Sequence, residues 1–389
     1  MKETIRFVSK PAREVEGVTV IADAVEGTSR PSSPFPVRFD SPEVEGRAAA
    51  RWERDVAAFA ARSPVPPRAC YRIEDATCLW PGMVVVAPDN TIVRETASAN
   101  KQLRKVPGFA ALKKKQVQAL ARVGAPLEAA IEPPVVLEGD FFLLSSSIYG
   151  NYFHWLIECL PKIAVWRQTG EHRKLLCPPL EAPFHRQSLA LAGVSNDRIA
   201  QPGGNVRTPG ELLFSDRIRP GTDRISRSVI PFFDDLRTRV AATKERKRRL
   251  FVSRSGAKVR RLLNEDEVTG TLAPLGFEAI RAETLSFAEQ MSLYAGAEII
   301  VAPHGAGLAN TAICHPGTVI VELIHDRFEQ PGGGTAYAAI ADFGGLRYGL
   351  VVGGADPDAS GNVTRESSFD FRIRPESVLE MIEDLGGRL

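Results

Sequence analysis

The sequence predicts an α/β protein built from two Rossmann-like, doubly wound domains. Its 389 residues are enough for two domains, each with its own core. Hydrophobic residues make up 44% of the chain and charged residues 25%, a composition that excludes a disordered protein. From about residue 133 onward, short apolar segments alternate with helical patterns. This alternation is typical of a parallel sheet covered by helices.

Residues 1–130 lack this regularity, and we expect them to form an irregular N-terminal extension. Pro-rich segments flank one helical stretch at 47–61. Residues 83–87 and 91–95 are apolar runs separated by a Pro-Asp-Asn turn, and this pattern predicts a β-hairpin.

Residues 131–225 are predicted to form the first Rossmann-like domain, together with parts of the extension and a C-terminal helix. Residues 151–168 carry apolar side chains at helical spacing, and Pro161 is a candidate kink. A second helix is expected at 187–193. The expected strands are 135–137, 141–144, 174–177 and 212–214.

Residues 245–350 repeat the pattern more clearly and are predicted to form the second doubly wound domain. Asn264 is placed to cap a helix with an acidic first turn, and Ser286 with Glu289 forms a capping box that opens another. The expected strands are 250–253, 277–280, 298–302 and 319–322, and a short helix is expected at 308–314. Residues 351–389 are expected to end in a helix, 375–385, that packs back on the first domain.

Charge and composition exclude several classes of protein. The chain has 49 Lys and Arg against 47 Asp and Glu, so a surface that binds nucleic acid as a whole is not expected. The first ten residues lack the apolar segment of a signal peptide, and no run reaches the roughly 18 apolar residues of a membrane helix. Five cysteines without a Cys-x-x-Cys pair favour reduced, buried thiols in the cytoplasm.

The segment from His304 to Asn310, His-Gly-Ala-Gly-Leu-Ala-Asn, follows a predicted strand and opens a predicted helix. Gly305 and Gly307, on either side of Ala306, allow backbone N–H groups to approach a ligand, and a helix N-terminus favours an anion. His304 and Asn310 would add side-chain donors to a phosphate. The alternative is a tight turn that binds nothing, because short glycine motifs are common.

Two enzyme classes with similar glycine motifs are disfavoured. An esterase would need a Gly-x-Ser-x-Gly nucleophile segment, which the sequence lacks. A dinucleotide-dependent oxidoreductase would need Gly-x-Gly-x-x-Gly after an early strand, and this motif is also absent.

Residues 244–261 contain nine Lys or Arg and one acid. We interpret the first part of this run as a solvated face. Arg254 follows a predicted strand, at the edge where doubly wound folds bind ligands, and Arg260 and Arg261 lie on the same edge. Guanidinium groups there fit a diphosphate. Nucleic acid is the alternative anion, but the interleaved aromatic residues that would favour it are absent.

His154 and Glu158 are four residues apart and share one face of a predicted helix. They fit a general base and its partner. The alternative is an ordinary surface pair on a helix capped by Asn151. A metal site is less favoured because no third ligand is near. The pair Asp356 and Asp358 could hold a metal, but its Gly-rich surroundings indicate a solvent loop.

Four segments together resemble glycosyltransferase family 61. They are 151–161, Val252-Ser-Arg-Ser255 with Arg261-Leu-Leu-Asn-Glu265, 285–290 and 304–310, and they occur in the family's order. The resemblance covers roughly residues 140–325. Without a secretory anchor, the chain resembles a bacterial-type, cytoplasmic member of the family.

The resemblance implies a GT-B architecture, in which two Rossmann-like domains face a cleft. The acceptor would lie mainly on 131–225 and the nucleotide sugar on 245–350. It implies an inverting glycosyltransferase that needs neither a divalent metal nor a cofactor, with a UDP-linked sugar as donor. The expected acceptor is a hydroxyl of a glycan or lipid-linked saccharide, as in polysaccharide synthesis, and this fits a peripheral position at the inner membrane. No nucleic-acid partner is implied.

The resemblance also assigns roles by position. Glu158 is preferred as the general base with His154 positioning the acceptor, and the reverse assignment stays open. Asn151 and Trp155 are acceptor-side candidates. The residues expected at the diphosphate are Arg254, Arg261, His304, Gly305, Ala306, Gly307 and Asn310, with Glu322 near the ribose.

Two rival functions stay open at the level of sequence. A sugar-nucleotide epimerase or hydrolase with the GT-B fold would act on the donor without an acceptor. A non-catalytic protein that binds nucleotide sugars would keep the anion site alone. Sugar and acceptor specificity lie in loops without transferable motifs.

Overall fold

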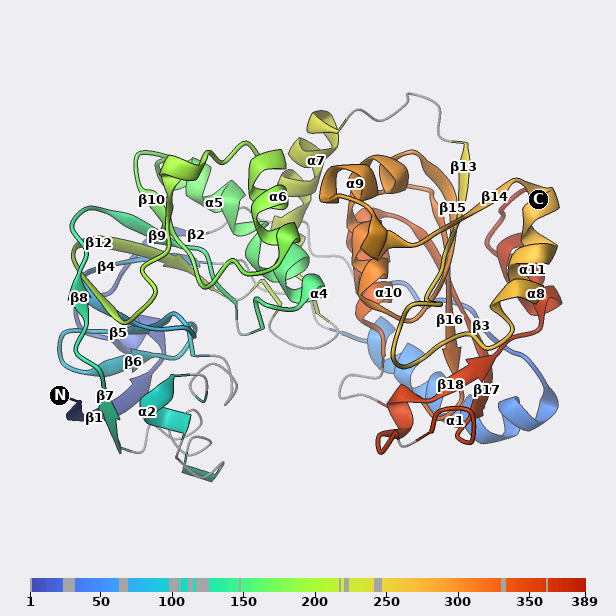
Figure 1. Cartoon of the computed structure of the whole chain (residues 1–389), viewed down its shortest axis with the longest axis horizontal. Coiled ribbons are helices and arrows are strands. Elements are labelled where there is room, and N and C mark those ends of the chain that lie inside the picture. Colours follow the sequence, from blue (N-terminus) through green and yellow to red (C-terminus); the bar gives the residue numbers. More distant parts are fainter. Residues whose placement is uncertain are drawn as a thin grey trace. The chain divides into compact units, whose positions relative to one another are not determined.

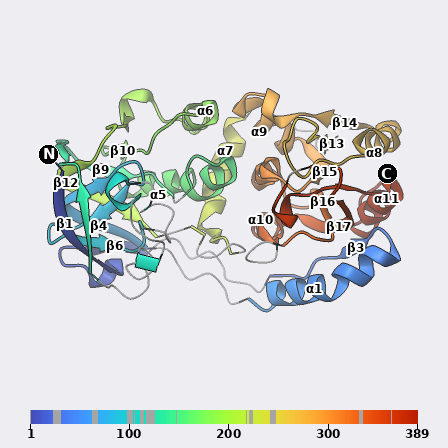
Figure 2. The same cartoon turned by 60° about the horizontal axis from the view of Figure 1, so that its bottom comes forward.

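The computed structural model describes residues 2–23, 32–62, 69–97, 126–146, 148–216, 224–240, 247–329, 334–361 and 363–389, with short pieces at 104, 106–110, 115–116 and 218–219. It is a mixed α/β structure that divides into two compact units (Figures 1 and 2). Unit 1 contains Met1–Gly27 and Pro66–Ile218, and unit 2 contains Thr28–Val65 and Arg219–Leu389.

Unit 1 is built on a mixed sheet, which has eleven strands among the described residues. They are β1 (Glu3–Lys10), β2 (Thr19–Asp23), β4 (Ala69–Leu79), β5 (Val84–Val86), β6 (Thr91–Val93), β7 (Leu127–Ile131), β8 (Val135–Val136), β9 (Phe141–Leu143), β10 (Lys174–Leu176), β11 (Ile199–Ala200) and β12 (Val206–Ser215). Strands β11, β10, β9 and β12 are neighbours in that order and run parallel. Strand β4 pairs antiparallel with β12 and continues the sheet through β5, β6, β1 and β7.

The helices of unit 1 follow its parallel strands. They are α4 (Tyr152–His154), the π-helical turn η3 (Trp155–Cys159), α5 (Lys162–Thr169) and α6 (Pro183–Leu191), and the short α2 (Pro107–Ala110) lies earlier in the chain. The helix expected at 151–168 is therefore broken into three pieces. Leu160 donates its N–H to the carbonyl of Trp155, five residues earlier, at 3.0 Å, and Pro161 follows directly.

The prediction of an irregular N-terminal extension is wrong for the part of the chain that the structure describes. Strands β1 and β4 to β7 belong to the sheet of unit 1, and the predicted hairpin is confirmed as β5 and β6. The sequence pattern did not predict strand β4, because the strand contains several charged residues. One of them, Arg72, pairs with Glu211 on the neighbouring strand at 2.9 Å, so its charge is satisfied only once the sheet has formed.

Unit 2 carries the doubly wound sheet that the sequence predicts. Its strands are β3 (Val37–Phe39), β13 (Arg248–Val252), β14 (Phe277–Ile280), β15 (Ala297–Pro303), β16 (Val319–His325), β17 (Arg347–Asp356) and β18 (Asp370–Arg372). Strands β14, β13, β15, β16 and β17 are neighbours in that order and run parallel. All four strands expected between 245 and 350 are confirmed.

Helices cover both faces of this sheet (Figure 1). Helices α8 (Glu265–Leu272) and α11 (Pro375–Asp384) lie on one face, and their apolar side chains join the core of the strands. The 3₁₀ helix η8 (Ala306–Ile313), α9 (Phe287–Ala295), α10 (Ala336–Gly344) and α7 (Ile230–Arg239) lie toward the other. The capping box predicted for α9 is present, since the Ser286 and Glu289 side chains each accept from the other's backbone N–H.

Two segments lie in a different unit from the one expected. Strand β3 pairs parallel with β17, and α1 (Pro42–Ala60) follows it, so residues 28–65 extend unit 2 (Figure 2). The C-terminal helix α11 packs on β16 and β17 of unit 2 and not on the first domain. Gly349 makes this possible, because a Cβ there would lie 2.3 Å from Met381 Sδ.

All five cysteines are buried free thiols, as predicted. Burial raises the pKa of Cys70, Cys78 and Cys159 to about 12. Among the described residues, no helix combines the length and the apolar character that a membrane crossing requires.

The position of α11 predicts where its substitutions act. Met381 is fully buried on the sheet of unit 2, so Met381→Ala should lower the free energy of unfolding by about 2–4 kcal/mol, measured by denaturant titration. Glu383→Ala, on the exposed face of the same helix, is the control and should change it by less than about 0.5 kcal/mol. Equal effects of the two changes would contradict this packing.

Candidate functional site

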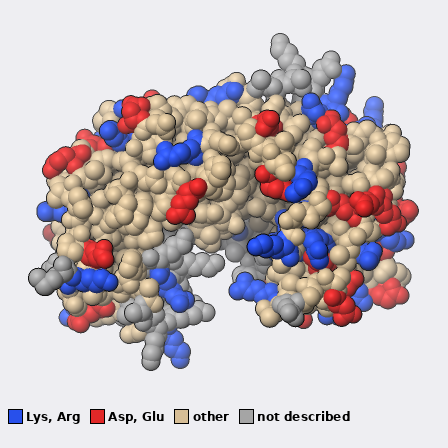
Figure 3. Space-filling model, in the orientation of Figure 1, with Lys and Arg blue, Asp and Glu red and all other residues tan. Residues whose placement is uncertain are grey.

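Cationic and imidazole side chains gather where the parallel strands of unit 2 end. Arg254 follows β13, His304 follows β15, and His325 is the last residue of β16. Because the carboxyl ends of parallel strands meet at one edge, these residues share the edge at which doubly wound folds bind ligands. On the face drawn in Figure 3, Lys and Arg are otherwise interspersed with Asp and Glu.

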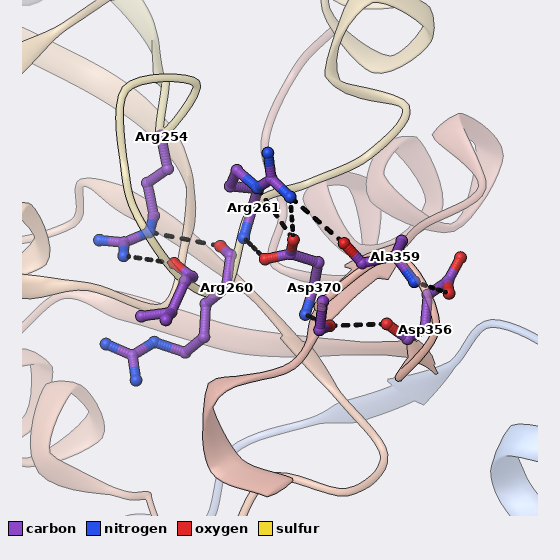
Figure 4. A network of polar contacts seen from close by, with 8 residues as sticks. Arg254, Arg260, Arg261, Asp356, Ala359 and Asp370 are labelled. Atoms are coloured by element: carbon purple, nitrogen blue, oxygen red, sulfur yellow. Dashed lines mark hydrogen bonds and ion pairs between the residues drawn. The ribbon is translucent and has the colours of Figure 1, made fainter. Parts of the chain in front are cut away.

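Arg254 and Arg260 are held by backbone carbonyls, and Figure 4 shows the contacts of Arg254. Arg254 donates from Nη2 to the carbonyl of Val259 at 3.0 Å and from Nε to that of Arg260 at 3.4 Å. Arg260 donates from Nε to the carbonyl of His304 at 3.3 Å and from Nη1 to that of Ser367 at 3.4 Å. Within the described ranges, neither guanidinium forms an ion pair with a carboxylate.

The two guanidinium groups are therefore largely buried charges that no carboxylate among the described residues pairs with. Burial lowers the pKa of both, and the charge of Arg260 lowers the pKa of Arg254 further. Carbonyl dipoles orient each group but do not neutralise it. An anion with two adjacent phosphate groups would supply the missing charge and bidentate acceptors.

Arg261, predicted at the diphosphate, lies elsewhere. Its guanidinium binds Asp370 Oδ2 from Nε at 2.9 Å and from Nη2 at 2.6 Å, and its backbone N–H binds Oδ1 of the same residue at 2.7 Å. Asp370 is 2% exposed, so Arg261 compensates a buried carboxylate. Arg260 has a φ of 55°, and the two consecutive side chains leave the loop in different directions (Figure 4). Arg260 takes the place expected for Arg261.

The glycine motif forms the strand, turn and helix that the sequence predicts. Gly305 precedes Ala306, the first residue of η8, and the Tyr337 hydroxyl donates to the Gly305 carbonyl at 2.5 Å. A Cβ at position 305 would lie 1.9 Å from Arg254 Nη1, so the arginine rests directly on the glycine backbone. At Gly307 the nearest atom would be 3.6 Å away, an ordinary contact.

Two of the predicted ligand contacts are wrong, because their side chains have no exposed surface. Asn310 is 0% exposed and donates to Gln290 Oε1 at 2.9 Å. Glu322 is also 0% exposed; it binds the Nδ1 of His304 and accepts from the Tyr348 hydroxyl at 2.5 Å. Both residues lie behind the edge and support it, and neither reaches a ribose or a phosphate there.

The pair predicted in unit 1 is formed. His154 Nδ1 lies 2.7 Å from Glu158 Oε1, across the junction of α4 and the π-helical turn. The two side chains are 19% and 11% exposed, so the pair is mostly buried but reachable. A π-helical turn of this kind is frequent at functional sites.

The two acceptor-side candidates differ in exposure. Asn151 is exposed and caps α4, with its side chain accepting from the His154 N–H at 3.4 Å. Trp155 is 0% exposed; its indole N–H donates to Ser188 at 2.8 Å and its ring lies edge-on to His185. Trp155 is therefore a core residue, and its predicted acceptor contact is wrong.

The Asp-x-Asp motif forms a turn at the end of β17. Asp356 Oδ1 accepts from the N–H of Ala359 at 2.9 Å, and Asp358 is exposed. Over the ranges that the structure covers, no three His, Cys, Asp or Glu side chains are grouped so that they could hold a metal ion.

Residues 152–321 match the family described as Glycosyltransferase 61. The chain carries a glycosyltransferase family 61 domain. It is therefore a glycosyltransferase, with donor and acceptor substrates. A comparison with curated proteins gave no match. The match to this family disfavours the rival functions of epimerase, hydrolase and non-catalytic binding protein.

The family 61 match includes most of the site residues described above. It contains the His154–Glu158 pair of unit 1 and both Arg254 and Arg260 of unit 2. Glu322 follows the matched segment directly.

Sequence reasoning missed several residues at the ligand-binding edge of the unit 2 sheet. Tyr337 and Tyr348 come from α10 and β17, far along the chain from their partners. Arg47 and Arg51 come from α1; the first pairs with the Asp326 carboxylate and the second donates to the Asp326 carbonyl at 3.0 Å. No local sequence signal connects α1 with the end of β16.

His325 is a fully buried histidine at the same edge. Neither of its ring nitrogens has a hydrogen-bond partner among the described residues, and Phe328 and Phe371 lie with ring centroids 5.8 Å away. Burial lowers its pKa to about 4. The charge of Asp326 raises this pKa, and those of His304, Arg260 and Arg51 lower it.

This histidine predicts an acid-dependent loss of stability in unit 2. From about one pH unit above 6.5, the side chain is almost entirely neutral in both folded and unfolded chains, so it contributes little pH dependence. As the pH falls from there toward 4, the unfolded chain takes up a proton here and the folded chain does not. His325→Leu should reduce the fall in unfolding free energy over this window by about 3 kcal/mol, followed by denaturant titration.

The same variant should unfold at neutral pH with unchanged or slightly increased free energy, because no hydrogen bond is lost. A loss of more than about 2 kcal/mol at pH 7.5 would mean that the imidazole nitrogens have partners, and would contradict the prediction.

Proposed function

We propose that this glycosyltransferase transfers a sugar from a nucleotide sugar, UDP-linked, and that Arg254 and Arg260 hold the diphosphate. The observation that carries the proposal is the pair itself. Two guanidinium groups at the carboxyl ends of parallel strands are oriented by carbonyls, and no carboxylate among the described residues pairs with them. A diphosphate is the anion that matches two adjacent positive groups.

The reaction proposed is a single displacement at the anomeric carbon. The acceptor hydroxyl oxygen forms a bond to that carbon while the bond to the diphosphate oxygen breaks, which inverts the configuration. The leaving diphosphate gains one negative charge, which the two arginines stabilise in place of a divalent metal. No other cofactor is needed for this step.

The acceptor proton is assigned to the pair in unit 1. Glu158 is proposed as the general base, with His154 positioning the acceptor hydroxyl, because the two are 2.7 Å apart and partly exposed. In GT-B glycosyltransferases one domain binds the donor and the other binds the acceptor. We assign the donor to unit 2 and the acceptor to unit 1. The acceptor proposed is a hydroxyl of a glycan or lipid-linked saccharide, modified in the cytoplasm.

The arginine pair predicts a specific loss of nucleotide binding. Arg254→Ala and Arg260→Ala should each weaken UDP binding about 10- to 100-fold, because each removes a charge-assisted contact to phosphate. Isothermal titration calorimetry measures this directly. Arg248→Ala is the matched control, since Arg248 lies at the start of β13 in an exposed ion pair with Glu278 and should leave the affinity unchanged.

The glycines provide a steric test of the same site. Gly305→Ala should weaken UDP binding, because its methyl would displace the Arg254 guanidinium from its place on the glycine backbone. Gly307→Ala, with only ordinary contacts, should weaken it much less. Unchanged affinity in both Arg254→Ala and Gly305→Ala would sink the diphosphate assignment.

The proposed base predicts a loss of turnover without a loss of donor binding. Glu158→Gln keeps the size of the side chain but cannot take a proton, so transfer should fall by about 10²- to 10⁴-fold. The Kd for UDP should stay within a factor of two of the wild-type value. Sugar transfer is measured by release of nucleoside diphosphate, and near-normal release would contradict the role of Glu158.

A further inference from the structure

A buried chain of three polar side chains lies directly behind the arginine pair. His304 binds one carboxylate oxygen of Glu322 through Nδ1, and the Tyr348 hydroxyl donates to the other at 2.5 Å. His304 follows β15, Glu322 lies within β16 and Tyr348 within β17, and these three strands are neighbours in the sheet. Glu322 is 0% exposed, whereas the His304 side chain keeps 9% of its surface exposed.

This chain fixes both the orientation and the tautomer of the imidazole. Because Nδ1 is bound to a carboxylate, it carries the proton of the neutral ring, and Nε2 is the nitrogen that a ligand can meet. Phe328 and Tyr337 pack against the ring with centroids 4.4 and 5.1 Å away. Tyr337 also binds the Gly305 carbonyl, so the imidazole and the glycine motif are held by the same residue.

Several neighbouring groups affect the pKa of His304. Burial is the largest effect and lowers its pKa, and the positive charges of Arg260 and Arg254 lower it further. Glu322 acts in the opposite direction and raises this pKa. The other titratable neighbours are Tyr337, Tyr348 and His325, and burial keeps all three in their neutral forms at pH 7.

We propose that His304 takes up a proton at Nε2 when a diphosphate binds beside Arg254 and Arg260, that Glu322 is the positioning residue that makes this possible, and that Tyr348, through its hydrogen bond to Glu322, sets the pH at which the uptake occurs. The inference rests on the proposed function, because the diphosphate supplies the negative charge that offsets the two arginines. Glu322 then faces an imidazolium, and the buried carboxylate gains an ionic partner.

Every proton in the proposed reaction is accounted for. When the bond between the anomeric carbon and the diphosphate oxygen breaks, that oxygen keeps the electron pair. The Nε2–H group of His304 donates a hydrogen bond to the diphosphate and retains its proton. The acceptor proton leaves separately through the base of unit 1, and His304 returns its own proton to solvent when the nucleoside diphosphate dissociates.

Calorimetry in several buffers tests the uptake. Inorganic pyrophosphate and UDP are titrated into the full chain at pH 7.5 in buffers that differ in ionisation enthalpy, and the buffer dependence of the heat gives the number of protons taken up. Wild type should take up about one proton more than His304→Gln for each ligand. His325→Gln is the matched control, a buried histidine at the same edge, and should keep the wild-type uptake.

Two further variants separate a positioning role from a merely structural one. Glu322→Gln removes the charge that favours the imidazolium, so uptake at pH 7.5 should be lost while pyrophosphate still binds. Tyr348→Phe removes only one hydroxyl and is expected to fold. Without this donor the carboxylate charge is less stabilised and the pair holds its proton more tightly, so half-maximal uptake should move up by about one pH unit.

The outcomes are distinct. Uptake in His304→Gln equal to that of wild type would overturn the inference and leave the proposed function intact. A Tyr348→Phe variant with a lower Tm but an unchanged pH profile of uptake would overturn the positioning role of Tyr348. Failure of both pyrophosphate and UDP to bind wild type would overturn the proposed function itself, and this inference with it.

Discussion

The candidate donor site depends on the close approach of the Arg254 guanidinium to the backbone of Gly305. This contact interlocks the turns that follow β13 and β15, and only a residue without a side chain permits it. Arg260 binds the carbonyl of His304 just before the glycine, and Tyr337 binds the carbonyl of Gly305 itself. Backbone carbonyl dipoles therefore orient the positive charges, and they do so without neutralising them.

Two histidine–carboxylate pairs among the described residues have the same contacting atoms and different surroundings. His154 and Glu158 lie on one helical turn and remain partly exposed. His304 and Glu322 lie on neighbouring strands, and the carboxylate is fully buried. Exposure suits the first pair to exchange a proton with an acceptor. Burial suits the second to respond to the charge of a ligand, since electrostatic effects are stronger where water is excluded.

Local sequence patterns predicted the features that depend on neighbouring residues in the chain. Apolar runs located β13 to β16, the capping box located the start of α9, and the spacing of four placed His154 beside Glu158. The sequence could not reveal contacts between distant segments. Arg260 and Arg261 are the same residue type, so the sequence does not tell them apart. Two features decide which of them faces the site. One is the left-handed backbone at 260, and the other is the ion pair of Arg261 with Asp370, 109 residues further on. The roles of Glu322 and Trp155 depended in the same way on burial.

The parallel pairing of β3 with β17 has a consequence for how the protein is made. Val37 lies opposite Leu350, so the first strand of unit 2 and its partner are separated by more than 300 residues of chain. At about 5–20 residues per second, a ribosome needs about 15–60 s to add that length. During this time α1, with its buried side chains Trp52 and Phe59, has been synthesised, but strand β17, which α1 contacts, has not. Unit 1 can complete its sheet in this interval, whereas unit 2 closes only when its earliest and latest residues meet.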